Sequence, residues 1–287
     1  MTDKIIILAG GISSRMKEKP KIFKESLTKL YSQADNKSKS MLTLDGKRPF
    51  LDYLMFNIMD AGLKQVLIVI GEKDKSIPEY YGPKENDNVF EDLLVSYAIQ
   101  KIPPDREKPW GTADALYQGL IKVPHWKGEE FLVANSDNLY STESMKSLIC
   151  CNYKHALLDY DRDGLLFETS RVSRFAITKK NKSGFLTDIK EKPNQEQIDA
   201  CVDTNGIIRV SMNCWKFYYD QIFPYLETCP ENPIRKEKEL PSAVLNMIKE
   251  HPDSVFAIPL KEHVPDLTSK DDIFSVIEYL KNNKPLE

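Results

Sequence analysis

The first half of the chain alternates short apolar runs of strand length with longer stretches whose apolar residues recur at helical spacing. Runs at residues 5–8, 65–70 and 131–134 predict buried strands. Apolar residues recur every three or four positions over residues 49–61 and 112–121, which predicts a helix between each pair of strands. Strand, helix, strand, helix, strand is typical of an α/β fold in which helices cover both faces of a mostly parallel sheet.

The second half of the chain has a different pattern. Two short alternating runs, residues 174–178 and 185–189, flank a glycine-containing turn and predict a hairpin. Residues 207–212 predict a further strand, and helices are expected over residues 241–249 and 271–282. No Pro- or Ser-rich linker separates the halves. We therefore expect one mixed, mostly parallel central sheet with helices on both faces.

Charge and composition exclude several classes of protein. The net charge is −3, and Lys and Arg are interspersed with Asp and Glu, which argues against nucleic acid as a partner. The longest apolar runs are too short to cross a bilayer, and the first residues enter a strand without the sections of a signal peptide. We expect a soluble, cytoplasmic protein with no membrane partner. The five cysteines are expected to be reduced thiols, and the four histidines form no H-E-x-x-H zinc motif.

A buried strand runs directly into paired glycines in the segment from Leu8 to Met16. Gly10 and Gly11 allow close approach of the backbone to a flat or anionic ligand, and the Ser and Arg side chains that follow can donate to phosphate. The spacing is not G-x-G-x-x-G, which disfavours a dinucleotide site and a Rossmann oxidoreductase. No Gly-Lys-Ser/Thr follows, which excludes a P-loop.

This segment resembles the L-A-G-G-x-[GS]-[TS]-R-M signature of the nucleotidyltransferase superfamily, whose members make nucleotide sugars and related activated compounds. The resemblance implies a Rossmann-like nucleotidyltransferase fold and an enzyme that joins a nucleoside triphosphate to a phosphorylated acceptor. The nucleotide contacts that it implies in this segment are Ala9, Gly10, Gly11, Ser13, Ser14 and Arg15.

The family also places a lysine after this turn, typically in Pro-Lys-x-Leu and shortly before a Gly-Lys-Pro that opens a helix. Lys21 follows a proline close to the turn, whereas Lys39 has the matching downstream context at Gly46, although Ser38 replaces the proline. We favour Lys39 and keep Lys21 as the alternative. The implied role is to neutralise charge on the α-phosphoryl group.

Gln100 and the pair Gly111 and Thr112 resemble residues that border the base in the relatives. A carboxamide donates and accepts at once, which suits uracil or thymine and favours UTP or dTTP. Thr112 is alternatively an ordinary helix N-cap. The gap from Gln100 to Gly111 is longer than in the family, and Ser13 and Ser14 also resemble the guanylyl- and cytidylyltransferases that activate molybdenum cofactor, so the base stays open.

Two aspartates are candidate magnesium ligands. Asp137 follows a hydrophobic strand, where open α/β sheets bind ligands, and Mg²⁺ uses one or two carboxylates plus phosphate oxygens. The alternative for Asp137 is a turn residue. The segment around Asp266 resembles the family's W-x-D-[IT]-x-[TD], which implies that this residue is the second ligand. The implied cofactor is Mg²⁺, and the implied catalytic residues are Arg15, Lys39 and Asp137.

The run from Gly184 to Pro193 resembles G-x-[VI]-x-x-[IF]-x-E-K-P of sugar nucleotidyltransferases. There the Glu accepts from sugar hydroxyls and the Lys meets the sugar phosphate, which implies these roles for Glu191 and Lys192. From the residues alone, the run is a charged strand end. A second strand resembles one that lines the sugar pocket and makes Ser211 and Asn213 candidate hydroxyl partners.

These expectations combine into a Mg²⁺-dependent sugar-1-phosphate nucleotidyltransferase that releases pyrophosphate. We expect one domain over residues 1–287, with a nucleotide-binding part at about 1–140, a sugar-phosphate-binding part at about 141–270 and a C-terminal helix at about 271–282. Residues 17–40 are interpreted as an insertion, either a mobile surface excursion or a lid over the phosphates. The alternatives are transfer to a non-sugar acceptor such as phosphocholine or molybdenum cofactor, and a non-catalytic nucleotide-sensing domain. The sugar and the oligomeric state, a homo-oligomer included, stay open.

Overall fold

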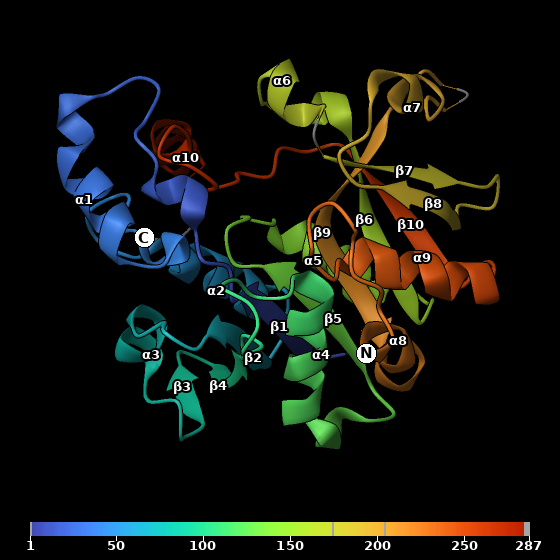
Figure 1. Cartoon of the computed structure of the whole chain (residues 1–287), viewed down its shortest axis with the longest axis horizontal. Coiled ribbons are helices and arrows are strands. Elements are labelled where there is room, and N and C mark those ends of the chain that lie inside the picture. The colour runs from blue at the N-terminus through green and yellow to red at the C-terminus, as the bar shows by residue number, and fades with distance from the viewer. Residues whose placement is uncertain (1, 174, 204, 284–287) are drawn as a thin grey trace.

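The computed structural model describes residues 2–173, 175–203 and 205–283. Over these residues ten strands form one sheet (Figure 1). In chain order the strands are β1 (Lys4–Ala9), β2 (Gln65–Gly71), β3 (Asn88–Phe90), β4 (Leu93–Gln100), β5 (Glu130–Asn135), β6 (His155–Asp161), β7 (Ala176–Lys180), β8 (Leu186–Lys190), β9 (Arg209–Tyr218) and β10 (Val255–Leu260). Arg174, where the sequence predicted the start of β7, lies outside the described residues.

The main path of the sheet has the order β10-β6-β9-β5-β1-β2-β4-β3, and the β7–β8 hairpin joins it through β9. Strands β4, β2, β1 and β5 are parallel neighbours. Strand β9 runs antiparallel between β5 and β6, and β10 is parallel to β6. The sheet is therefore mixed and mostly parallel, as predicted, and strands from both halves of the chain belong to it.

Helices cover both faces of this sheet because successive side chains of a buried strand point to opposite sides. Ile5 and Ile7 of β1 belong to one hydrophobic cluster with α2, α5 and α10, whereas Ile6 and Leu8 belong to a second cluster with α4, α8 and α9. The helices are α1 (Thr28–Asn36), α2 (Phe50–Asp60), α3 (Ser76–Tyr81), α4 (Thr112–Lys122), α5 (Thr142–Cys150), α6 (Thr169–Val172), α7 (Gln195–Asp199), α8 (Tyr219–Glu227), α9 (Leu240–Glu250) and α10 (Asp272–Asn282). None of the helices in the described part of the chain is long and apolar enough to span a membrane.

The segment at residues 17–40, interpreted above as an insertion, contains the nine-residue helix α1 and lies against α10 (Figure 1). Lys270 Nζ lies 2.6 Å from Asp35 Oδ1, and the backbone N–H of Lys21 donates to Asp271 Oδ1 at 2.8 Å. The segment therefore contacts the residues that immediately precede the C-terminal helix. Whether it closes over phosphates stays a prediction.

Candidate active site

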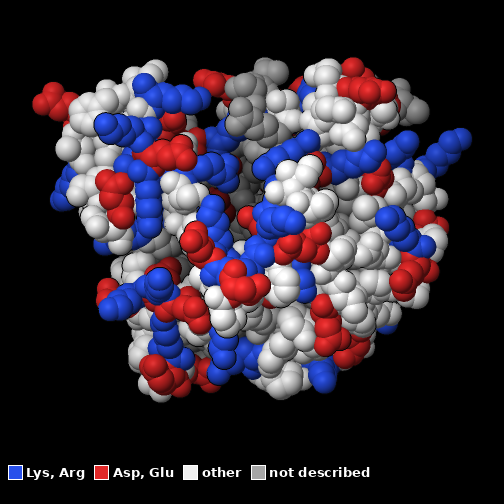
Figure 2. All heavy atoms as spheres, in the orientation of Figure 1, with Lys and Arg blue, Asp and Glu red and all other residues white. Residues whose placement is uncertain are grey.

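Four parallel strands end at the same edge of the sheet, where open α/β sheets bind ligands. Strand β1 leads into Gly10, β2 ends at Gly71 and β4 ends at Gln100. The turn after β5 is fixed beside β1, because the backbone N–H of Ser136 donates to the carbonyl oxygen of Leu8 at 3.1 Å. Figure 2 shows a hollow in the surface between the α1–α10 side and the β7–β8 side, with Lys and Arg side chains around its opening.

The predicted phosphate-binding turn leaves the sheet at the end of β1. Ala9 is the last, buried residue of the strand, and Ser13 adopts a left-handed backbone with φ 52° before a short 3₁₀ helix, η1 (Ser14–Lys17). Gly11, Ser14 and Arg15 are exposed. The Arg15 guanidinium has no ion-pair partner among the residues that the structure describes. Its charge is therefore available to a ligand.

Gln100 is buried beside the glycine turn. A Cβ atom on Gly10 would lie 2.4 Å from Gln100 Oε1, so only glycine fits there without a rearrangement. Gln100 Nε2 donates to the carbonyl oxygen of Gly111 at 3.0 Å and to Asp114 Oδ2 at 2.9 Å. Both amide hydrogens are thus used within the protein. The side chain was expected to donate and accept at once, but in this arrangement only the acceptor Oε1 remains for a base.

Thr112 is the first residue of α4, and Gly111, with φ 99°, is the N-cap. The alternative interpretation of Thr112 as the N-cap is therefore wrong. Its hydroxyl oxygen instead accepts the backbone N–H of Leu240 at 2.9 Å, and Ala113 N donates to the Lys238 carbonyl at 3.0 Å. Glycine is needed at position 111 because a Cβ there would lie 2.5 Å from the Lys238 carbonyl oxygen. These contacts join the start of α4 to the segment before α9.

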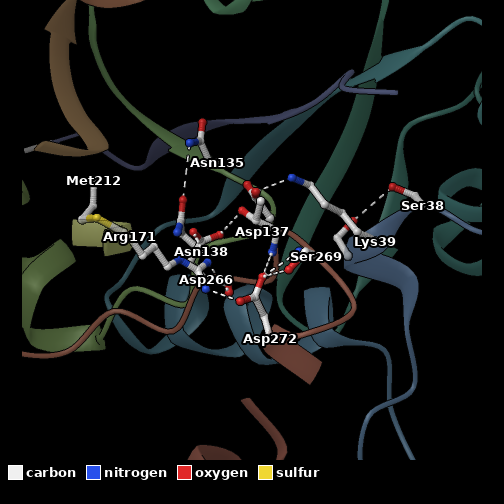
Figure 3. Close-up of polar contacts among 12 residues, drawn as sticks. Ser38, Lys39, Asn135, Asp137, Asn138, Arg171, Met212, Asp266, Ser269 and Asp272 are labelled. Carbon is white, nitrogen blue, oxygen red and sulfur yellow. Dashed lines mark hydrogen bonds and ion pairs between the residues drawn. The ribbon is translucent and has the colours of Figure 1, made fainter. Parts of the chain in front are cut away.

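Asp137 follows β5, and its carboxylate forms an ion pair with Lys39 (Figure 3). Lys39 opens a 3₁₀ turn, η3 (Lys39–Met41), at the end of the insertion. Both side chains are largely buried, with 18% of Lys39 and 14% of Asp137 exposed. Lys21, the alternative candidate, is exposed, and its backbone contacts Asp271. The structure thus brings Lys39 to the predicted metal ligand and places Lys21 beside α10.

Asp266 lies next to the Asp137 turn although the two residues are far apart in sequence. Asn138 and Asp266 form an isolated antiparallel bridge, and the N–H of Leu267 donates to the carbonyl oxygen of Asp137 at 2.8 Å. Burial raises the pKa of the Asp266 carboxyl, and the nearby charge of Asp137 raises this pKa further. Backbone pairing therefore brings the two predicted metal ligands together.

Arg171 of α6 completes this cluster, and the sequence analysis did not identify it. Its Nη2 donates to Asp266 Oδ2 at 2.6 Å and to the Asp266 carbonyl oxygen at 3.1 Å, and its Nη1 pairs with Asp272 (Figure 3). The arginine lies in the stretch from residue 141 to 173, which matches the family patterns poorly. No motif or periodicity singles it out, so only the fold reveals this contact.

The predicted sugar-binding pair follows β8. The Glu191 carboxylate lies 3.6 Å from Arg235 Nη2, and this guanidinium also pairs with Glu239. Burial raises the pKa of Glu191. Lys192 is exposed and has a left-handed backbone with φ 46°. Arg235, a second residue that the sequence analysis did not identify, therefore holds the Glu191 carboxylate from the segment before α9.

Ser211 and Asn213 lie on β9, next to the Asp137 turn. Ser211 Oγ accepts the backbone N–H of Asn213 at 3.1 Å, and Asn213 Oδ1 is buried with no hydrogen-bond partner among the described residues. The Tyr140 hydroxyl donates to the carbonyl oxygen of Met212 at 2.6 Å and lies 3.3 Å from Asn138 Oδ1. Tyr140 therefore ties this strand to the turn that carries Asp137.

Asp137 and Asp266 are the residues of this cluster that could hold a metal ion. In the described part of the chain, no group of three or more His, Cys, Asp or Glu side chains is placed to hold a metal ion. A structural zinc site needs four such ligands, whereas Mg²⁺ takes one or two carboxylates together with water and substrate phosphate. Asp137 and Asp266 supply two carboxylates, and each already holds a cationic side chain. Two carboxylates are the number that Mg²⁺ typically takes from a protein.

The sheet is mostly parallel, and its strand ends carry a glycine turn and an acidic turn. This is an α/β protein with a candidate ligand site at the edge where open α/β sheets bind ligands. The family model described as Nucleotidyl transferase matches residues 4–256. The chain belongs to this family, which confirms the predicted superfamily.

Curated relatives and solved structures agree with this assignment. The glucose-1-phosphate adenylyltransferases of Bacillus cereus (strain Q1) and Bacillus anthracis are each 24% identical over 267 residues, which are 91% of this chain and 63% of the relative. The chain thus spans 63% of the length of these relatives.

Two solved structures share the fold. A UDP-glucose pyrophosphorylase from Acinetobacter baumanii superposes with a TM-score of 0.71 at 16% identity, covering 99% of this chain and 95% of the other. A UDP-glucose pyrophosphorylase complexed with UDP-glucose gives a TM-score of 0.70 at 18% identity, covering 99% and 100%. These likenesses confirm the predicted mixed α/β fold.

Proposed function

We propose that this protein transfers a nucleotidyl group from a nucleoside triphosphate to a sugar 1-phosphate, with Mg²⁺ as cofactor, and releases pyrophosphate. The observation that carries the proposal is the Lys39–Asp137 ion pair at the edge of the sheet, with Asp266 on the neighbouring backbone. The names of the curated relatives and of the solved structures refer to glucose 1-phosphate and to UDP-glucose, which supports a sugar phosphate as the acceptor.

In this reaction a phosphate oxygen of the sugar 1-phosphate forms a bond to the α-phosphorus while the bond to the pyrophosphate oxygen breaks. The attacking phosphomonoester has a second pKa of about 6 and is largely dianionic near neutral pH, so it needs no general base. Arg15 and Lys39 would neutralise charge on the triphosphate. Asp137 and Asp266 would hold the Mg²⁺, which when bound supplies further charge neutralisation at the phosphate oxygens.

The two substrates would bind at the ends of different strands of the sheet. UTP or dTTP stays the proposed nucleotide: Gln100 Oε1, beside Gly10, would accept the ring N–H of uracil or thymine. Glu191 and Lys192 would bind the sugar and its phosphate. The unpaired Oδ1 of Asn213 offers a buried acceptor for a sugar hydroxyl. A cytoplasmic location stays a prediction from the sequence.

The test is pyrophosphate release by the purified protein with a panel of nucleoside triphosphates, sugar 1-phosphates and Mg²⁺. Lys39→Ala and Asp137→Asn are each expected to lower kcat by about 10²–10³-fold, as loss of one group that stabilises developing charge does. Lys21→Ala and Asp60→Asn are the matched controls, because both residues are exposed and lie outside the Lys39–Asp137–Asp266 cluster. Near-normal rates in Lys39→Ala and Asp137→Asn would overturn the site.

The same panel separates the alternatives. Phosphocholine is included as a non-sugar acceptor. Turnover with phosphocholine but with no sugar 1-phosphate would show that the proposed acceptor is wrong. Binding of a triphosphate without pyrophosphate release in any combination would indicate a non-catalytic nucleotide-sensing protein.

A further inference from the structure

We propose that Arg171 is a built-in competitor of the divalent ion: its guanidinium occupies the Asp266 carboxylate, and the ion must displace it to bind there. This inference rests on the proposed magnesium site and adds a residue that controls how that site fills. It makes Arg171 a positioning residue that opposes metal binding in the free protein.

Each oxygen of the Asp266 carboxylate accepts a hydrogen bond in the present arrangement. Arg171 Nη2 donates to Oδ2 at 2.6 Å, and Thr268 Oγ1 donates to Oδ1 at 2.7 Å. A hydroxyl donor can remain beside a carboxylate oxygen that also binds a metal, because that oxygen has a second lone pair. A guanidinium carries a full positive charge and is repelled by the ion. Arg171 is therefore the partner that metal binding must move.

Arg171 is anchored by groups other than this carboxylate. Its Nη1 pairs with Asp272, and Nη2 also reaches the Asp266 carbonyl oxygen at 3.1 Å (Figure 3). The guanidinium carbon lies 4.5 Å from the centre of the Phe167 ring. Asp272 is itself fixed, since its Oδ2 accepts the N–H groups of Thr268 at 3.0 Å and Ser269 at 2.6 Å. A displaced Arg171 would thus stay close to the ion and continue to oppose it.

Asp266, in contrast, does not depend on Arg171 for its position. Its backbone is paired with Asn138, the N–H of Leu267 donates to the Asp137 carbonyl oxygen, and Thr268 holds Oδ1. Removal of the arginine therefore leaves the carboxylate in place and without its strongest counter-charge. A buried carboxylate in that state gains more from a divalent ion than one that already has a cationic partner.

The test measures binding of Mn²⁺ alone to the nucleotide-free protein, by the loss of the free-ion electron paramagnetic resonance signal. Arg171→Gln is expected to bind Mn²⁺ about tenfold more tightly than the wild type, which is within the usual range for coupled binding equilibria. A merely structural role would weaken binding or leave it unchanged, and either result overturns the proposal.

Two further variants separate charge from other effects. Arg171→Lys keeps the charge and is expected to bind Mn²⁺ as weakly as the wild type. A higher affinity for Mn²⁺ in this variant would therefore also overturn the proposal. Arg162→Gln is the matched control for the lost charge, because Arg162 is 27% exposed against 25% for Arg171 and pairs only with a surface aspartate in the described structure. It should leave the affinity unchanged. Circular dichroism confirms that each variant is folded.

Asp137→Asn and Asp266→Asn distinguish this inference from the proposed function. If both variants lose Mn²⁺ binding while Arg171→Gln binds Mn²⁺ no more tightly than the wild type, the metal site stands and the proposed competition by Arg171 is wrong. If neither aspartate variant alters Mn²⁺ binding, the proposed metal site fails, and the inference fails with it.

Discussion

The nucleotide edge, formed by the ends of β4, β2, β1 and β5, and the acceptor side, formed by β7, β8 and β9, are built differently. At the nucleotide edge, Gly10 lies so close to the Gln100 amide, and Gly111 so close to the Lys238 backbone, that neither position has room for a Cβ atom. On the acceptor side, the residue that follows β8, Glu191, is held by a charged pair with Arg235. Close approach at glycine therefore shapes the turn after β1 and the start of α4, whereas a charged pair holds the turn after β8.

The largest expected effect tests the backbone half of this comparison. Gly111→Ala places a Cβ 2.5 Å from the Lys238 carbonyl oxygen at a backbone φ of +99°. We expect the free energy of unfolding to fall by about 3 kcal/mol, because strain and overpacking add. Gly128→Ala is the control, since its φ is +80° and its Cβ meets nothing within 4 Å. If urea denaturation shows the same loss of unfolding free energy in Gly111→Ala and Gly128→Ala, the close approach at Gly111 is unimportant.

Gly10→Ala tests the contact with Gln100. The added Cβ would lie 2.4 Å from Oε1 of an amide that is held by two hydrogen bonds, and we expect a loss of about 2 kcal/mol. Gly11→Ala, whose Cβ meets nothing within 4 Å, should be close to neutral in the same denaturation assay. A neutral Gly10→Ala would mean that the glycine turn tolerates side chains.

Acid pH tests a buried group beneath the acceptor side. His155 on β6 is buried, and burial lowers its pKa to about 4. In the unfolded chain its pKa is about 6.5, so the unfolded state takes up the proton first as the pH falls. Stability from this group is complete above pH 6.5 and is lost progressively towards pH 4, with roughly 2 kcal/mol lost by pH 5.

The measurement is the difference in unfolding free energy between pH 7 and pH 5, in the wild type and in His155→Gln. The variant should lose less stability on acidification. His125→Gln, at an exposed site, should behave as the wild type. The same pH dependence in all three proteins would contradict the assignment to His155.

The smallest expected effect concerns the acceptor. Glu191→Gln keeps the size of the side chain and removes the charge that pairs with Arg235. We expect the KM for the sugar 1-phosphate to rise about tenfold, the value of one hydrogen bond to a charged group, with little change in the KM for the triphosphate. Steady-state kinetics with each substrate varied in turn measures this split. Glu196→Gln, exposed on α7, is the control.

The regularity of the apolar pattern explains how much of the fold could be predicted. The uninterrupted apolar runs of β1, β2 and β5 and the helical spacing of α2 and α4 were sufficient to place these elements. Strand β6 was not predicted, because Asp159 and Asp161 interrupt its apolar pattern. Asp159 is nevertheless buried, since Lys180 lies 2.7 Å from its carboxylate. Helix α8 was also missed, and it contains Pro224.

The candidate site shows the same division. Asp137, Lys39 and Asp266 could be proposed because they lie in segments that resemble family motifs, and the fold brings them together. Arg171 and Arg235 could not be proposed, because they come from a short helix and a connecting segment without any sequence pattern. Their partners are set by tertiary packing, which composition and spacing do not encode.

The contact between α1 and the residues that lead into α10 has a consequence for synthesis on the ribosome. Lys270 meets Asp35 across a sequence separation of 235 residues, and Asp266 precedes α10 by only a few residues. Translation proceeds from the amino terminus, so the glycine turn and Asp137 emerge long before the segments that complete the cluster around them. We expect proteases to cleave the insertion in a nascent chain that is stalled before Asp266. The insertion should become protected from proteolysis only after α10 has emerged.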